Sequence, residues 1–267
     1  MRWSHWREHF EDQATRPLPS LDDAFTAMAS DERTEIARSL AKFQLGEAGE
    51  GRIAHEIDGV HLPTLDADYR RALKLFVAEE GRHARLLGLA VKHLGGRLLA
   101  RTWTERLFVF GRRLLGVRLK LIVLLAAEIL GLTFYGLVVR VLPRGSLRTL
   151  LRQICRDELF HLRFHADFLG SQAQGIGGRL LLRGALWLVC LSAAAVVLLD
   201  HLGTLRATRV SAAAVFRRMV KLTACADRRA YASGSESGAA RAIPRRRLSS
   251  RAACRETSTR SPLRISA

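Results

Sequence analysis

The chain lacks the sequence features of several protein classes. Its four cysteines lie far apart and form no Cys-x-x-Cys pair, which argues against a zinc ribbon, a rubredoxin-type iron centre and a disulfide scaffold. Only 6 of 267 residues are proline and 7% are aromatic, so helices are favoured over a many-stranded sandwich. The N-terminus has no apolar run of the kind found in secretory signals. A reduced, cytoplasmic setting is therefore expected.

Positive charge is abundant, with 43 Lys and Arg against 25 Asp and Glu and a net charge of +18. From Asp227 onward there are ten Arg and three acids. We expect residues 223–267, rich in Arg, Ser, Ala and Gly, to form a disordered tail. Because this tail is poor in aromatic residues that could stack on bases, no specific nucleic-acid partner is expected.

Apolar residues recur every three or four positions in four long stretches, which predicts four main helices. Residues 1–30 precede them as an arm, where Trp3, Trp6 and Phe10 share one face of a short helix. A connector of about 20 residues between the second and third main helices is long enough to cross the length of a bundle. The four predicted helices span residues 31–58, 67–94, 117–142 and 146–169.

The segment 171–222 is predicted to contain an apolar helix followed by a basic amphipathic helix. Within it, residues 184–199 form a run of sixteen residues without a charge. Because a bilayer crossing needs about 20 residues, a buried helix, a partial membrane anchor and a true span all remain open. A membrane surface, contacted through residues 184–199, is accordingly an expected partner.

Six residues form a pattern typical of a metal site. Glu80-x-x-His83 and Glu158-x-x-His161 lie on the second and fourth predicted helices, where residues three apart share one face. The first helix supplies Glu47 or Glu50, and the third has one acid, Glu128, in an apolar surrounding. Four carboxylates and two imidazoles can neutralise two divalent cations, whereas unpaired buried carboxylates would cost several kcal/mol each, roughly.

Three further residues are predicted to lie just outside this set. An acid precedes each Glu-x-x-His motif, and we expect Glu79 to pair with His161 and Asp157 with His83 across the site. His165 follows His161 by one turn and is expected to support the site rather than to bind a metal.

The stretch FQLGEAGEGRIAHEI resembles the first ligand helix of rubrerythrins and demethoxyubiquinone hydroxylases. With the four acids and two Glu-x-x-His motifs, residues 31–170 resemble the ferritin-like di-iron carboxylate superfamily. The resemblance implies an all-α four-helix bundle with one long crossover, followed here by an additional apolar C-terminal helix. It also implies two iron ions, with manganese as the alternative, and makes Glu47 the ligand and Glu50 its neighbour or an extra ligand.

The function expected from this resemblance is an oxygen- or peroxide-dependent oxidoreductase acting on a small apolar substrate, with an unidentified electron donor and as a homodimer. Rubrerythrins carry a Cys-x-x-Cys iron centre, absent here, and an extra Glu where this chain has Leu125, which argues against a peroxidase. One alternative is a metal-binding or oxidative-stress protein of the same fold without hydroxylation. The other is a non-catalytic, membrane-associated helical protein with solvated acids.

Overall fold

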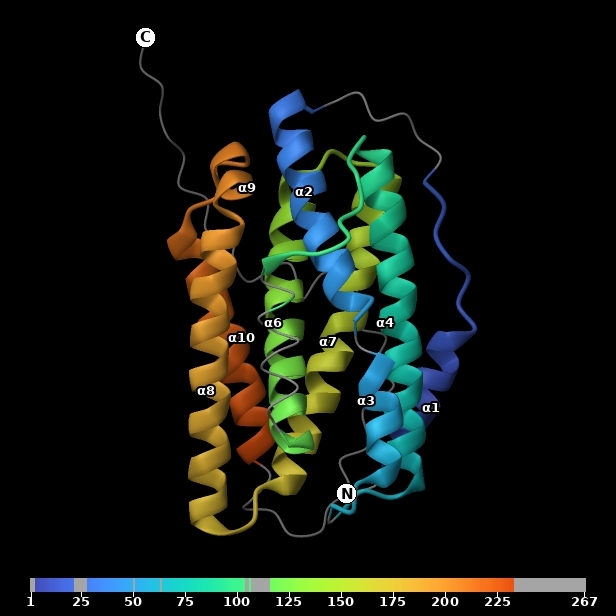
Figure 1. The fold of residues 1–267 in the computed structure, drawn as a ribbon, viewed down its shortest axis with the longest axis vertical. Coiled ribbons are helices and arrows are strands. Elements are labelled where there is room, and N and C mark those ends of the chain that lie inside the picture. The colour runs from blue at the N-terminus through green and yellow to red at the C-terminus, as the bar shows by residue number, and fades with distance from the viewer. Residues whose placement is uncertain are drawn as a thin grey trace. The chain divides into compact units, whose positions relative to one another are not determined.

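The computed structural model describes residues 3–21, 28–49, 51–62, 64–103, 106 and 116–232. These residues form helices and connecting turns without a strand, which confirms the predicted all-α fold class (Figure 1). The helices are α1 Ser4–Ala14, α2 Ser30–Glu47, α3 Gly51–Glu56, α4 Ala67–His93, α6 Val117–Val141, α7 Ser146–Gln172, α8 Gly175–Asp200, α9 Leu202–Ala207 and α10 Ala212–Ala232, with a 3-10 turn, η1, at Ile57–Gly59.

Four helices, α2, α4, α6 and α7, surround the part of the core that holds the predicted site. In this group α2 packs on α4, α6 on α7, and α4 on α7. Helices α4 and α6 run in the same direction, so the chain leaves α4 at one end of the bundle and enters α6 at the other (Figure 1). The connection from α4 to α6 must therefore cross the length of the bundle. Of this connection, residues 104, 105 and 107–115 lie outside the described part of the chain.

The apolar helix α6 is the core helix of the bundle. It is apolar nearly all round, as expected for a helix with neighbours on every side. Of its most apolar stretch of 18 residues, 89% is buried inside the protein. Helix α8 is also long and apolar enough to cross a membrane, but only 28% of its own most apolar 18-residue stretch is buried. The run 184–199 is therefore neither a fully buried helix nor a segment separate from the bundle, since α8 packs on α6 and α10.

The first predicted helix, 31–58, is divided in the structure. Helix α2 ends at Glu47, and α3 begins at Gly51 after a short break. Gly46, Gly49 and Gly51 surround this break, and each glycine lowers helix stability by roughly 1 kcal/mol relative to alanine. Glu47 thus lies at the end of a helix rather than within one.

The C-terminal helices also differ from the prediction. Helix α7 continues through Gln172 and α8 starts at Gly175, so only residues 173 and 174 separate them, and the apolar helix begins well before residue 184. The predicted 200–222 helix is two helices, α9 and α10. The predicted start of disorder at residue 223 is wrong, because α10 continues to Ala232 and buries Ala226, Asp227 and Ala230. The remainder of the tail lies outside the described residues.

The arm is held on the bundle by its aromatic residues. Trp3, Trp6 and Phe10 are almost completely buried, as the spacing predicted. The indole of Trp3 donates to the carbonyl of Thr64 (2.7 Å), and that of Trp6 donates to Asp167 of α7 (3.1 Å). The arm is therefore part of the folded core.

A buried polar network fixes α9 to α2. Ser39 Oγ lies 2.7 Å from His201 Nδ1 and 2.5 Å from Thr204 Oγ1, and Thr204 donates to the carbonyl of Glu35. Burial, aided by the nearby Lys42 ammonium, lowers the pKa of His201 to about 4. His201 is consequently an uncharged core residue at neutral pH.

This burial predicts a specific acid sensitivity. The unfolded chain binds a proton on His201 near pH 6.5, whereas the folded chain binds it only near pH 4. Between these values the unfolded state holds more protons, so stability falls as pH falls, by up to about 3 kcal/mol for this residue. His201→Asn retains a polar group for Ser39 but removes the titration. Urea unfolding at pH 7 and about pH 4.5 should show a smaller loss for this variant than for the wild type.

The matched control is His55→Asn, because His55 is exposed on α3. It should lose as much stability on acidification as the wild type. Equal acid sensitivity of His201→Asn and the wild type would contradict the assignment of His201 as a buried neutral histidine.

Candidate metal centre

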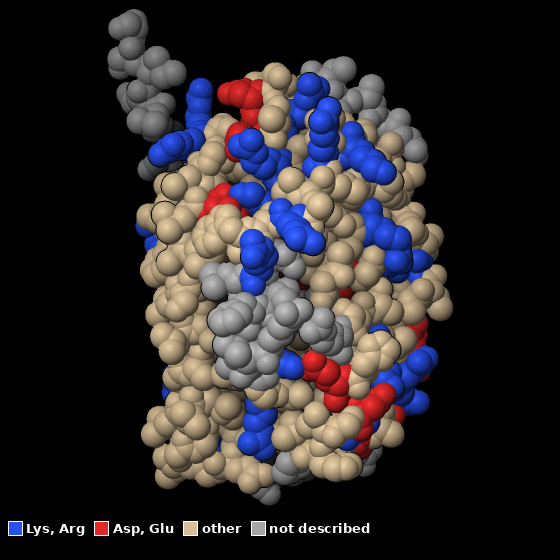
Figure 2. Space-filling model, viewed as in Figure 1, with Lys and Arg blue, Asp and Glu red and all other residues tan. Residues whose placement is uncertain are grey.

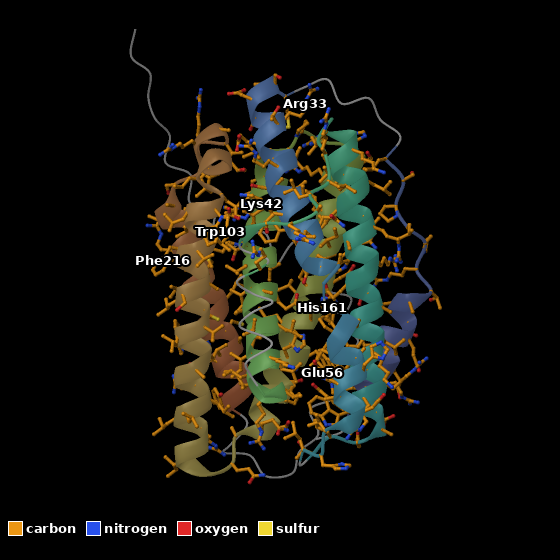
Figure 3. The ribbon with its side chains drawn as sticks, in the orientation of Figure 1. Arg33, Lys42, Glu56, Trp103, His161 and Phe216 are labelled. Atoms are coloured by element: carbon orange, nitrogen blue, oxygen red, sulfur yellow. The ribbon has the colours of Figure 1, made fainter. Side chains whose placement is uncertain are left out.

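The six predicted ligands come from the four helices that surround the core. Helix α4 supplies Glu80 and His83, and α7 supplies Glu158 and His161; in each pair a three-residue spacing places both side chains on the inward face. Glu47 comes from the end of α2 and Glu128 from the middle of α6. Figure 3 shows His161 in the interior, near the middle of the bundle's length.

The two Glu-x-x-His motifs meet in a compact cluster. One ligand atom from each of Glu80, His83, Glu158 and His161 lies within 4.8 Å of the others. His161 Nδ1 is 2.6 Å from Glu80 and 3.3 Å from Glu158, and His83 Nδ1 is 3.2 Å from Glu158. All four residues are buried, with at most 1% of each exposed. This Glu/His cluster can hold a metal ion.

The outer nitrogens of both histidines face the acids that precede the motifs. His161 Nε2 lies 3.1 Å from Glu79, and His83 Nε2 lies 3.5 Å from Asp157. The structure therefore brings together the two pairs expected from the sequence. With Nε2 held by a carboxylate, each histidine presents Nδ1 to the centre of the cluster, which is how outer carboxylates orient metal-binding imidazoles.

Glu47 and Glu128 lie at the edges of the cluster. Glu128 is 3.7 Å from His161 Nδ1 and 3.8 Å from His165 Nε2, so His165 contacts an acid of the site. Glu47 accepts a 2.7 Å hydrogen bond from the hydroxyl of Tyr135. Gly131 leaves room for that ring, because a Cβ atom there would lie 3.1 Å from it.

The electrostatics of the cluster separate its acids into two kinds. Burial, reinforced by the neighbouring Glu80, raises the pKa of Glu47, and burial with Glu158 raises that of Glu128. Burial also opposes ionisation of Glu80 and Glu158, but contacts with the two histidines and hydrogen bonds with Glu47 and Glu128 outweigh it and lower both pKa values, that of Glu158 to about 2. The pKa values of His83 and His161 are raised, because their acidic neighbours outweigh burial.

Without a cation, two imidazolium groups thus balance two carboxylates, and two further acids keep their protons. His165 differs, because burial and the charge of His161 lower its pKa to about 3 and leave it neutral. Metal binding must displace protons from such a set, since only the deprotonated forms are ligands.

The ligand atoms of the cluster fit a shared cation better than they fit one another. Both oxygens of Glu80 and Glu158, both nitrogens of His83 and Nδ1 of His161 are buried and have no hydrogen bond of good geometry. Nε2 of His83 faces Asp157, whereas one ligand atom from each of the four residues lies within 4.8 Å of the others, close enough to share an ion. Unsatisfied buried polar atoms are rare in folded proteins, so this concentration calls for a partner.

Two residues near the site were not identified as partners from the sequence. Arg16 of the arm lies 3.2 Å from Asp157, and Arg82 of α4 anchors this part of the arm by donating to the carbonyls of Gln13 and Pro17. Tyr135 lies two turns after Glu128 on the same face of α6, where its hydroxyl reaches Glu47. No local signal points to Arg16, since its partner is 141 residues away. The alternative ligand Glu50 lies outside the described residues.

Comparison of the chain with protein-family models, with curated proteins and with solved structures gave no match.

The arm contact predicts that Arg16 strengthens metal binding. Arg16 holds Asp157, and Asp157 faces His83. Arg16→Gln should therefore free Asp157 and reduce the affinity for Mn²⁺ about tenfold, which is the low end of the loss seen when a hydrogen-bond partner of a metal ligand is removed. Arg16→Lys should restore part of the loss because it keeps the charge. Equilibrium titration with Mn²⁺ measures both.

Arg7→Gln is the matched control, since Arg7 lies on the same arm but pairs with Asp68, away from the cluster. Its Mn²⁺ affinity should equal that of the wild type. An unchanged affinity of Arg16→Gln would show that the arm covers the site without positioning Asp157.

Proposed function

We propose that this cluster binds two iron ions, with manganese as the alternative, and that the protein is an oxygen- or peroxide-dependent oxidoreductase of the ferritin-like di-iron type. In this proposal the ions would be held by the carboxylates of Glu47, Glu80, Glu128 and Glu158 and by the imidazoles of His83 and His161. The observation that carries the proposal is the group of buried, unsatisfied ligand atoms on α4 and α7 that face a common centre.

The number of acids supports two divalent ions rather than one. Four carboxylates carry the charge of two such ions, and two imidazoles complete the set. The two Glu-x-x-His motifs face each other, so each ion can take one histidine and share the glutamates of both motifs. When bound, a pair of iron ions supplies the electron transfer needed to reduce oxygen or peroxide.

The protein's own contribution is orientation, proton transfer and the exclusion of water. Glu79 and Asp157 hold the outer nitrogens of the histidines. Tyr135 holds Glu47, and the raised pKa values of Glu47, Glu128, His83 and His161 make these four residues the groups that would give up protons when cations enter. Aromatic rings close the cluster, with the ring of Phe76 4.9 Å from His161 and 4.7 Å from His165.

An apolar substrate is the class that suits these surroundings. The walls near the histidines are Phe76 and Phe10, and Leu125 of α6 is fully buried one turn before Glu128. A charged substrate would need a partner of opposite charge, and the charges of the cluster are already used by the ligands. Small, apolar, oxidisable molecules are therefore the proposed substrates.

Metal content tests this proposal directly. Protein reconstituted with Fe²⁺ under anaerobic conditions should contain close to two ions per chain, by elemental analysis. Glu128→Ala should retain close to one, because Glu128 is the terminal ligand from α6. On admission of oxygen the wild type should consume it and show a transient absorption that Glu128→Ala lacks.

Glu56→Ala is the matched control, because Glu56 is an acid on α3 that pairs with Lys120 rather than with the cluster. It should bind as much iron as the wild type. A wild type that binds neither iron nor manganese would overturn the proposal and favour a non-catalytic helical protein. Two bound ions without oxygen consumption would instead favour the metal-binding alternative without hydroxylation.

A further inference from the structure

Helix α8 exposes a continuous apolar stripe on the side that faces away from the bundle. Leu180, Leu188 and Leu199 keep 64%, 69% and 66% of their surface exposed, and Ile176, Leu181 and Leu191 are exposed as well. The opposite side of α8 buries Leu186, Cys190, Ala193, Ala194 and Val197 against the bundle. The stripe is therefore an outer face of the folded protein, not an unpacked part of its core.

This stripe contains no charge along most of its length. From Gly184 to Leu199 there is no Asp, Glu, Lys or Arg. Figure 2 shows the flank over α8 as largely uncharged, whereas blue side chains gather toward the end of the bundle where α2 begins. Soluble monomers rarely expose an apolar surface this continuous, and such surfaces mark sites of interaction.

The surroundings of the stripe are positively charged. Residues 175–232 contain nine Lys and Arg but only two acids, Asp200 and Asp227. Both acids are nearly buried and paired, Asp200 with Lys42 and Asp227 with Arg183, each at 2.8 Å. The exposed charges of residues 175–232 are therefore all cations: Arg179, Arg183, Arg206, Arg209, Arg217, Lys221 and Arg228.

We propose that the apolar stripe of α8 docks this protein on an anionic membrane surface, with the helix lying in the plane of the interface. Leucines that enter the boundary of the acyl chains, flanked by cations that meet anionic headgroups, are the features of helices that bind in this way. A second copy of the chain suits the stripe less well, because two such faces would bring their arginines together.

A membrane-spanning arrangement of α8 is inconsistent with the rest of the bundle. Helix α8 lies along α6, and on the other side of the bundle η1 and α4 carry the exposed ion pair of Asp58 and Lys74, and α4 carries the exposed Arg71. These charges could not enter hydrocarbon without a large cost. Only the outward face of α8 can contact lipid, so the contact is peripheral.

Flotation with vesicles tests the docking surface. The full-length protein should float with vesicles of phosphatidylcholine and phosphatidylglycerol, and less with phosphatidylcholine alone, and binding should weaken as salt rises. Leu188→Gln/Leu191→Gln should lower the partition coefficient roughly tenfold or more, because two exposed leucines lose their transfer to the acyl boundary. Arg217→Gln/Lys221→Gln should weaken binding to the anionic vesicles only.

Leu18→Gln/Leu89→Gln is the matched control, because these leucines are also exposed but lie on the arm and on α4. It should bind vesicles as the wild type does, and circular dichroism should show equal helicity for all variants. Undiminished binding of the Leu188/Leu191 variant would assign docking to the Arg-rich tail and overturn the proposal. So would a wild-type dimer, seen by analytical ultracentrifugation, that dissociates in this variant without any vesicle binding.

Discussion

Burying ionisable groups inside a helical bundle is the constraint on which this structure depends. Glu80, Glu128, Glu158 and two histidines meet between α2, α4, α6 and α7, where water cannot solvate them, and the partly exposed Glu47 lies beside them. Such a cluster is tolerable only if opposite charges balance, because each unpaired buried ion costs several kcal/mol, roughly. Protons supply the balance here, with charged histidines beside Glu80 and Glu158 and with protons kept by Glu47 and Glu128. Divalent cations could provide the same balance, since ligand atoms of Glu80, His83, Glu158 and His161 lie within 4.8 Å of one another.

The four main helices do not complete this site by themselves. The arm closes it, since Arg16 contacts Asp157 while Phe10 lies near the ring of His161. The two outer acids consequently differ in their surroundings. Asp157 faces the charged Arg16, whereas Glu79 lies near His9, whose pKa burial lowers to about 4. The two ends of the cluster are therefore electrostatically unequal, although the motifs that build them are alike. Two ions bound here would not have equivalent environments.

The sequence predicted the parts of the structure that depend on periodicity within one helix. A three-residue spacing fixes Glu80 with His83 and Glu158 with His161, and an acid within an apolar helix identifies Glu128, because both signals are local. The spacing of apolar residues could not show where a helix breaks or where contacts with distant residues make a polar segment helical. The glycines around Glu47 divide a helix that the apolar spacing alone would continue. Residues 223–232 look like a tail by composition, but they are helical because Asp167 of α7 binds Arg229. Arg16 was missed because its partner is distant in the chain.

The two proposals for this protein meet at α6. One side of α6 presents Glu128 to the cluster, and another packs against α8, whose outer stripe is the proposed membrane contact. Packed helix axes lie about 8–10 Å apart, so the interface would be only about two helix layers from the metal ligands. The apolar residues of α6 that surround Glu128 keep water from the cluster on the side that faces α8. An apolar molecule held in the bilayer would then reach the site across an apolar layer, without having to enter water.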